Sequence, residues 1–114
     1  MLTSGDVIDL DLGAPEGSEA GFLHPAVVVT AQPTLDFDPS IIQIVPATST
    51  LRHEHAEVVI GPDPHNGLDR PSAAQCQHVR SVASSRIAGV RGNVGPVVLA
   101  QIRDRLALLL DLPA

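Results

Sequence analysis

The 114-residue sequence contains no lysine, tryptophan or tyrosine, a single cysteine and two phenylalanines. So few aromatic rings argue against a surface on which nucleobases stack, and they leave Val, Leu, Ile and Ala to form the core. Cys76 has no second cysteine for an internal disulfide, which fits a reducing cytoplasm. No stretch reaches the ~20 apolar residues of a membrane span, and the N-terminus lacks the basic flank and apolar segment of a signal peptide. The sequence therefore indicates one small cytoplasmic domain over residues 1–114 without a membrane segment.

The charge is one-sided. The formal net charge is −6 at pH 7, and the first basic residue is Arg52. Seven acidic residues precede it: Asp6, Asp9, Asp11, Glu16, Glu19, Asp36 and Asp38. A protein that binds nucleic acid over a broad surface is normally basic. If this chain binds RNA, a small local patch must supply the positive charge, drawn from Arg52, Arg70, Arg80, Arg86 or Arg91.

Hydrophobic patterning predicts mostly short strands. Residues 7–12 alternate apolar and acidic side chains, which is typical of a strand with one solvent-facing side. The apolar runs 26–31 and 41–47 predict buried strands, the second ending at Thr48. Further strands are predicted at 56–60 and within 72–82. Loops rich in Gly, Pro, Ser and acidic residues are predicted at 13–21, 33–40 and 61–67.

The period changes to helical spacing over residues 93–111. Gly95-Pro96 suits the first turn of a helix, where the missing N–H of proline costs nothing. Apolar residues then recur at Leu99, Ile102, Leu106, Leu109 and Leu110, and Pro113 is expected to end the helix. The surplus of leucines near its end predicts packing on the sheet and against a second subunit. Short strands, tight turns and a terminal helix indicate a β-dominated α+β fold, a small β-barrel or half-barrel with a C-terminal helix.

Two stretches place polar side chains beside apolar strands: GSEAGFLHP at residues 17–25 and IVPATST at residues 44–50. Gly5-Asp6 precedes them, and QHVRSV follows at residues 77–82. In order and spacing, these motifs resemble the MazF/PemK family of toxin endoribonucleases along nearly the whole chain. The resemblance implies an SH3-like β-barrel of the MazF/CcdB type, assembled as a homodimer.

The resemblance also implies a function. The chain is expected to be the toxin of a type II toxin–antitoxin pair, held inactive by a MazE-like antitoxin. Its activity would be sequence-specific cleavage of single-stranded mRNA without a metal or other cofactor. Cleavage would leave 2′,3′-cyclic phosphate and 5′-hydroxyl ends and cause growth arrest.

In the family, an Arg before the Pro of the second strand and a Thr at the end of the third strand form the catalytic pair. Thr48 matches the Thr position, whereas His24 occupies the Arg position. Arginine is permanently charged and grips phosphate with a planar fork, while histidine is shorter and transfers protons better. The histidine at position 24 therefore has three possible consequences. It weakens stabilisation of the phosphate, it shifts the mechanism toward acid–base catalysis by the imidazole, or it leaves a nearly inactive protein. The resemblance places Glu19 beside the RNA, where a carboxylate can position or deprotonate the 2′-hydroxyl.

Further residues are candidates for RNA contact. Hydroxyl and amide groups hydrogen-bond phosphates and base edges, and arginines pair with phosphate. The candidates are Ser18, Ser49, Thr50, Arg52, Gln77 and Arg80. Arg80 is alternatively a contact for an acidic antitoxin tail or a structural arginine. In a continuous strand, Gln77, Val79 and Ser81 would share one face, with His78 and Arg80 on the other.

Two other functions fit the sequence. One is a catalytically attenuated MazF-like protein that binds an antitoxin or, like CcdB, a protein target. The other is a metal-binding regulator. In a strand, His53 and His55 would share one face, and a third ligand such as Glu57 or His78 would complete a site.

Overall fold

The computed structural model describes residues 1–12 and 23–113. Strands and helices follow one another along the chain as β1 (Asp6–Asp11), β2 (Leu23–Val28), α1 (Gln32–Leu35), β3 (Ile41–Thr48), β4 (Glu57–Ile60), β5 (Ser72–Gln75), η1 (Cys76–His78), β6 (Arg80–Ala83), η2 (Ser84–Arg86), β7 (Ile87–Asn93) and α2 (Gly95–Leu110). The predicted β-dominated fold with a C-terminal helix is confirmed.

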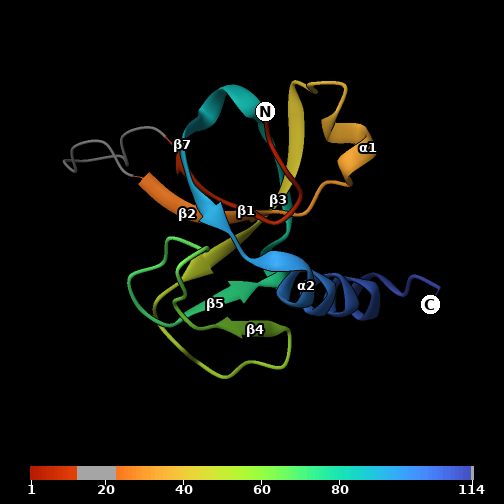
Figure 1. Ribbon diagram of the computed structural model, residues 1–114. Coiled ribbons are helices and arrows are strands. Elements are labelled where there is room, and N and C mark those ends of the chain that lie inside the picture. Colours follow the sequence, from red (N-terminus) through yellow and green to blue (C-terminus); the bar gives the residue numbers. More distant parts are fainter. Residues whose placement is uncertain (13–22, 114) are drawn as a thin grey trace.

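The described strands form one antiparallel seven-stranded sheet in the order β4-β5-β3-β2-β1-β7, with β6 also paired to β3. Strand β3 joins the two parts of the sheet. Its residues Ile41–Ile44 pair with β6, and its last two residues, Ala47 and Thr48, pair with β5. Figure 1 shows β4 and β5 turned away from the β1-β2-β7 layer, with α2 lying beside them.

The central residues of strands β1, β2 and β3 are buried on both faces. Val7, Val27 and Val45 belong to a core that includes the α2 residues Leu99, Ile102 and Leu106. The alternate residues Ile8, Val28 and Ile44 belong to a second core on the opposite face, together with Leu35 of α1. A strand with two buried faces reads as a continuous apolar run, which explains the runs at 26–31 and 41–47. As predicted, these cores consist almost entirely of Val, Leu, Ile and Ala, with Cys76 buried among them.

Helix α2 starts at the predicted Gly95-Pro96 step, where Gly95 has φ of +85° and its N–H donates to Asn93 Oδ1 at 2.7 Å. It ends at Leu110, before Pro113, because Asp111 adopts a left-handed conformation with φ of 54°. Leu109 and Leu110 are 47% and 56% exposed, so this end of the helix keeps an apolar surface outside the core. None of the described helices is long and apolar enough to cross a membrane.

The structure differs from the local expectations at several points. Two strands, β5 and β6, lie in the region 72–82 as predicted, but the 3-10 turn η1 separates them, so the expected alternation from Gln77 to Ser81 was wrong. The His53–His55 segment, which only the metal alternative required to be a strand, is not one, and His53 has a positive φ of 54°. The loop predicted at 33–40 contains most of the one-turn helix α1. Strand β7 was not predicted at all.

Candidate active site

The antiparallel pairing of β2 with β3 brings His24 and Thr48 to the same end of the sheet. The register pairs Ala26 with Pro46 and Val27 with Val45. Extending it by two residues places His24 opposite Thr48. Both side chains line one open pocket of about 350 Å³. The two positions singled out by the sequence are therefore brought together by the pairing of β2 with β3.

The pocket is completed by segments that are distant in sequence. Ser49 follows Thr48, Asp69 and Arg70 come from the segment that leads into β5, Ser72 is the first residue of β5, and Arg91 comes from β7. Two arginines, one carboxylate and three hydroxyls thus line the same space as His24. The cationic and neutral donors suit an anion such as a phosphodiester, whereas the Asp69 carboxylate opposes one.

The Thr48 hydroxyl is oriented by the backbone that follows it. Its Oγ1 accepts a hydrogen bond of 3.1 Å from the N–H of Thr50. A hydroxyl that accepts one bond still has its own proton to donate. The half-buried Thr48 can therefore donate to an oxygen of a bound group, while its lone pair stays tied to the chain.

His24 is half-buried between β1 and β3, opposite Leu10 in the β1–β2 pairing. Burial lowers the pKa of the His24 imidazole below its ordinary value of 6.5, because desolvation disfavours the charged form. At neutral pH the ring is therefore mainly uncharged. An uncharged imidazole accepts a proton readily but contributes little permanent charge to hold a phosphate.

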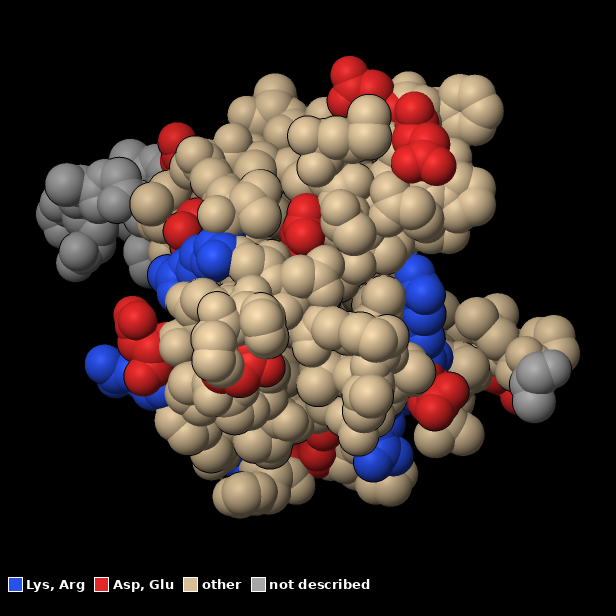
Figure 2. All heavy atoms as spheres, in the orientation of Figure 1, with Lys and Arg blue, Asp and Glu red and all other residues tan. Residues whose placement is uncertain are grey.

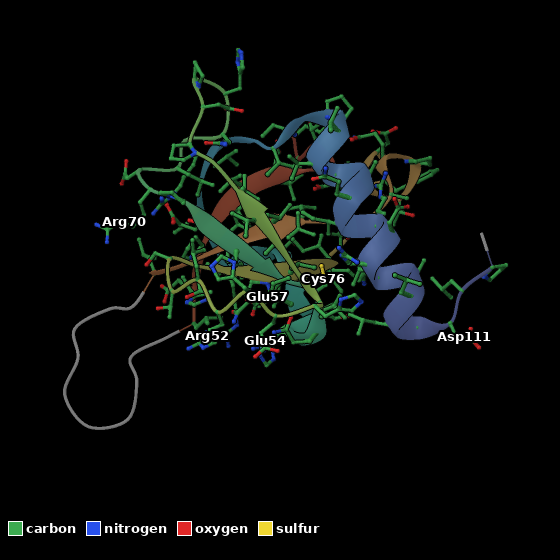
Figure 3. All side chains as sticks on the ribbon, turned by 90° about the horizontal axis from the view of Figure 1, so that it is seen from below. Arg52, Glu54, Glu57, Arg70, Cys76 and Asp111 are labelled. Carbon is green, nitrogen blue, oxygen red and sulfur yellow. The ribbon has the colours of Figure 1, made fainter. Side chains whose placement is uncertain are left out.

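Arg91 and Arg70 differ in how they are held. Arg91 Nε forms an ion pair of 3.0 Å with Asp9 Oδ1 of β1. Arg70 lies in an exposed loop, and Figure 3 shows its side chain at the edge of the molecule. Figure 2 shows basic atoms beside acidic atoms on the face in view, without a broad positive patch.

His24 also lines a second pocket, of about 450 Å³. Its walls are mostly apolar and come from β1, β3 and β6, with Leu10, Ile44 and Val82 among them. The RNA-binding candidate Arg80 lies here together with His78 and Gln75. Arg80 and Thr48 thus line different pockets, and His24 lines both.

The remaining candidates lie elsewhere. The exposed Arg52 lines neither pocket, and Figure 3 shows it beside Glu54 in the segment between β3 and β4. Gln77 is also outside both pockets, because its Nε2 donates to Glu57 Oε2 at 2.8 Å. Thr50 acts on Thr48 through its backbone, and its own side chain is exposed. Ser18 and Glu19 lie outside the described residues.

The metal alternative finds no ligand set in the part of the chain that the structure describes. There, no three side chains of His, Cys, Asp or Glu gather closely enough to hold an ion. His53 and His55 lie outside any strand, so the shared face that this alternative required does not form.

A sequence model of the PemK-like, MazF-like toxins of type II toxin–antitoxin systems matches residues 3–110. The chain belongs to this toxin family. It is similar to a protein named Endoribonuclease MazF9 from Mycobacterium tuberculosis (strain ATCC 25618 / H37Rv), with 34% identity over 116 residues and 98% of each chain covered.

Solved structures of the family share the fold. A MazE–MazF complex from Deinococcus radiodurans is similar with a TM-score of 0.77 and 25% identity, over 96% of each chain. An endoribonuclease from a mycobacterial species, solved in complex with its cognate antitoxin, has a TM-score of 0.77 and 22% identity over 100% of this chain and 99% of its own. The predicted MazF-type architecture is thus confirmed.

The sequence analysis did not identify two features of this region of the structure. Arg70 and Arg91 were only two of five arginines considered for a basic patch, and nothing assigned them to the side of Thr48. Arg91 reaches the pocket from β7, a strand whose small residues give no apolar alternation. The second feature is the structural role of Asn66 in the loop predicted at 61–67. Asn66 is 1% exposed and bonds Gly61, Asp63 and Leu68 within the loop that carries Arg70.

Proposed function

We propose that residues 1–114 form a single toxin domain that cleaves single-stranded mRNA at a short sequence, without a metal ion. The observation that carries the proposal is that His24 and Thr48 line one pocket together with two arginines. The name of the relative at 34% identity, Endoribonuclease MazF9, supports the same reaction class. His24 and Thr48 are the proposed catalytic residues.

The chemistry follows from the protonation state of His24. The uncharged imidazole takes the proton of the 2′-hydroxyl, and the 2′-oxygen attacks the adjacent phosphorus. The bond from phosphorus to the 5′-oxygen breaks, and that oxygen leaves with a proton from water. Thr48 donates a hydrogen bond to a non-bridging oxygen as negative charge builds there. The products are a 2′,3′-cyclic phosphate and a 5′-hydroxyl. Glu19 would assist from the loop before β2 by positioning the 2′-hydroxyl.

We further propose that the toxin works as a cytoplasmic homodimer and is neutralised by a MazE-like antitoxin. The exposed leucines at the end of α2, Leu108, Leu109 and Leu110, support burial against a second subunit. The antitoxin complexes among the similar structures support the second partner. Growth arrest would follow from loss of translatable mRNA.

The test is cleavage of a long RNA in excess EDTA by protein made in a cell-free system. The unsubstituted chain is compared with Thr48→Ala, His24→Gln and His24→Arg, and fragment ends are mapped by direct 5′ phosphorylation of free hydroxyls. We expect cleavage at one short sequence, with a loss of about 100-fold for Thr48→Ala, since it removes one donor to the developing charge.

Thr34→Ala is the matched control, because Thr34 is an exposed threonine on α1, away from both pockets. If Thr34→Ala and Thr48→Ala cleave RNA at the same rate, Thr48 has no role in the mechanism. If only His24→Arg cuts RNA, the chain is instead an attenuated binding protein with the fold of a toxin. Cleavage that stops in EDTA would refute the metal-free reaction.

A further inference from the structure

The candidate active site lacks the permanent cation that the family position of His24 would supply. We infer that Arg91 takes over this role and binds the scissile phosphate, positioned by Asp9. The inference rests on the proposed function and assigns a new residue to it. Arg91 lines the His24–Thr48 pocket, and its side chain is 32% exposed, so a ligand can reach it.

A bulge in β7 aims Arg91 away from the regular pleat. In the pairing of β1 with β7, Val7 lies opposite Gly92, whereas the next residue, Ile8, lies opposite Val90. Arg91 is therefore the extra residue between two paired positions. Bulges redirect a side chain locally and are frequent beside active sites. Here the redirected side chain lies over β1, the strand that also pairs with the His24 end of β2.

Asp9 holds the Arg91 guanidinium in place through only one of its three nitrogens. The ion pair uses Nε of Arg91, and the described residues provide no hydrogen-bond partner for Nη1 or Nη2. These two nitrogens can donate together to two oxygens of one phosphate. Asp9 lies opposite Pro25 across β1 and β2, so the carboxylate holds Arg91 next to the residue that follows His24.

The loop that carries Arg70 packs directly against the backbone of Arg91. A Cβ on Gly67 would lie 2.5 Å from the Arg91 carbonyl oxygen, and a Cβ on Gly92 would lie 2.1 Å from the His65 carbonyl oxygen. The Asn93 N–H donates to that same His65 oxygen at 2.8 Å. The residues on either side of Arg91 are thus paired with β1, and the loop packs against the backbone of Arg91 itself. A donor fixed before the substrate arrives needs no reorganisation during the reaction.

The test measures kcat and KM on an RNA oligonucleotide that contains the mapped cleavage sequence. Arg91→Gln should lower kcat/KM by about 100-fold, and Arg91→Lys should recover part of the loss, because lysine keeps the charge without the fork. Arg103→Gln on α2 removes the same charge outside both pockets and should leave the rate unchanged. Binding of the oligonucleotide with 2′-deoxyribose at the cleavage site should lose about 0.7 from its salt slope in Arg91→Gln, as expected for one lost phosphate contact.

Asp9→Asn separates positioning from general electrostatics. Removal of a negative charge should by itself tighten RNA binding to this acidic chain. If Asp9 positions Arg91, Asp9→Asn instead lowers kcat, and it has no further effect in the Arg91→Gln background. Thermal unfolding of each variant serves as a folding check, since an exposed ion pair contributes little to stability.

The outcomes distinguish this inference from the proposed function. If the unsubstituted chain cleaves RNA and this activity is lost in Thr48→Ala but not in Arg91→Gln, the role of Arg91 is overturned. The proposed ribonuclease function is then still supported. A higher kcat for Asp9→Asn overturns the positioning role of Asp9. Absence of cleavage in every variant, His24→Arg included, overturns both proposals.

Discussion

Two glycines on β7 provide a direct test of how the loop at residues 61–71 is attached to the sheet. Gly92 faces the loop, and a Cβ there would lie 2.1 Å from the His65 carbonyl oxygen and 2.8 Å from the Asn66 carbonyl carbon. Gly89, three residues earlier on the same strand, has no such neighbour within 4 Å. Neither has a positive φ, so alanine suits the backbone at both positions. Only the space around the new methyl group differs.

Gly92→Ala must push the loop away from β7. The displaced contacts include the 2.8 Å hydrogen bond from Asn93 N–H to the His65 oxygen, worth about 1 kcal/mol. Overpacking against backbone atoms adds ~1–3 kcal/mol. We therefore expect a loss of about 2–4 kcal/mol in the free energy of unfolding, which lowers the Tm of a chain of this size by roughly 8–16 °C. Gly89→Ala should be neutral or raise stability by ~0.5 kcal/mol, through a less flexible unfolded chain.

The assay is thermal and urea unfolding followed by far-ultraviolet circular dichroism, because the chain has no tryptophan or tyrosine to report by fluorescence. All proteins are compared at equal concentration, since association of subunits shifts the Tm. A difference of less than 0.5 kcal/mol between Gly92→Ala and Gly89→Ala would falsify the tight packing of the loop on β7, and with it the rigid backbone proposed for Arg91.

Three further predictions use other parts of the structure. Asn66→Ala should cost about 2–4 kcal/mol in urea unfolding, because it removes three hydrogen bonds inside the loop. His65→Ala, an exposed neighbour, should cost almost nothing; equal losses would contradict the structural role of Asn66. The pH profile of kcat/KM should show an acid limb with a pKa below 6.5 that disappears in His24→Arg. Because the unfolded imidazole protonates more readily than the folded one, stability should also fall as the pH drops below ~6.5, and less so in His24→Gln. Burial raises the pKa of Cys76 to about 11, so this thiol should react with a disulfide reagent only after unfolding; fast labelling of the native protein would refute its burial.

Burial explains how much of the fold was predictable. Strands β1, β2 and β3 are covered on one or both faces, so their apolar residues appear as clear runs or alternations in the sequence. Strand β7 contains Ala88, Gly89 and Gly92 and is paired only with β1, with two irregularities in register. Such a strand forms because its partner pairs with it, and its own sequence shows no hydrophobic pattern that would predict it.

The candidate site was predictable to the same extent as its strands. His24 and Thr48 sit at the ends of β2 and β3, and the resemblance to the toxin family identified both positions before their register was known. Arg91 depends on β7 and on a bulge within it, so its place beside His24 follows only from three-dimensional pairing. Arg52 is the arginine nearest in sequence to Thr48, yet it does not line the pocket, so closeness in sequence did not indicate which arginines lie beside Thr48.

The substitution at position 24 and the acidity of the chain have one physical consequence in common. An arginine at that position would combine phosphate binding and charge stabilisation in one residue, whereas His24 is mainly uncharged at neutral pH. In the mechanism that we propose, the two tasks are separated: the His24 imidazole acts on protons and the Arg91 guanidinium acts on charge. Since the net charge of −6 repels RNA at long range, affinity must come from contacts made inside the pocket. A nucleic-acid enzyme of this kind gains little from electrostatic attraction and depends on the correct placement of a few donors.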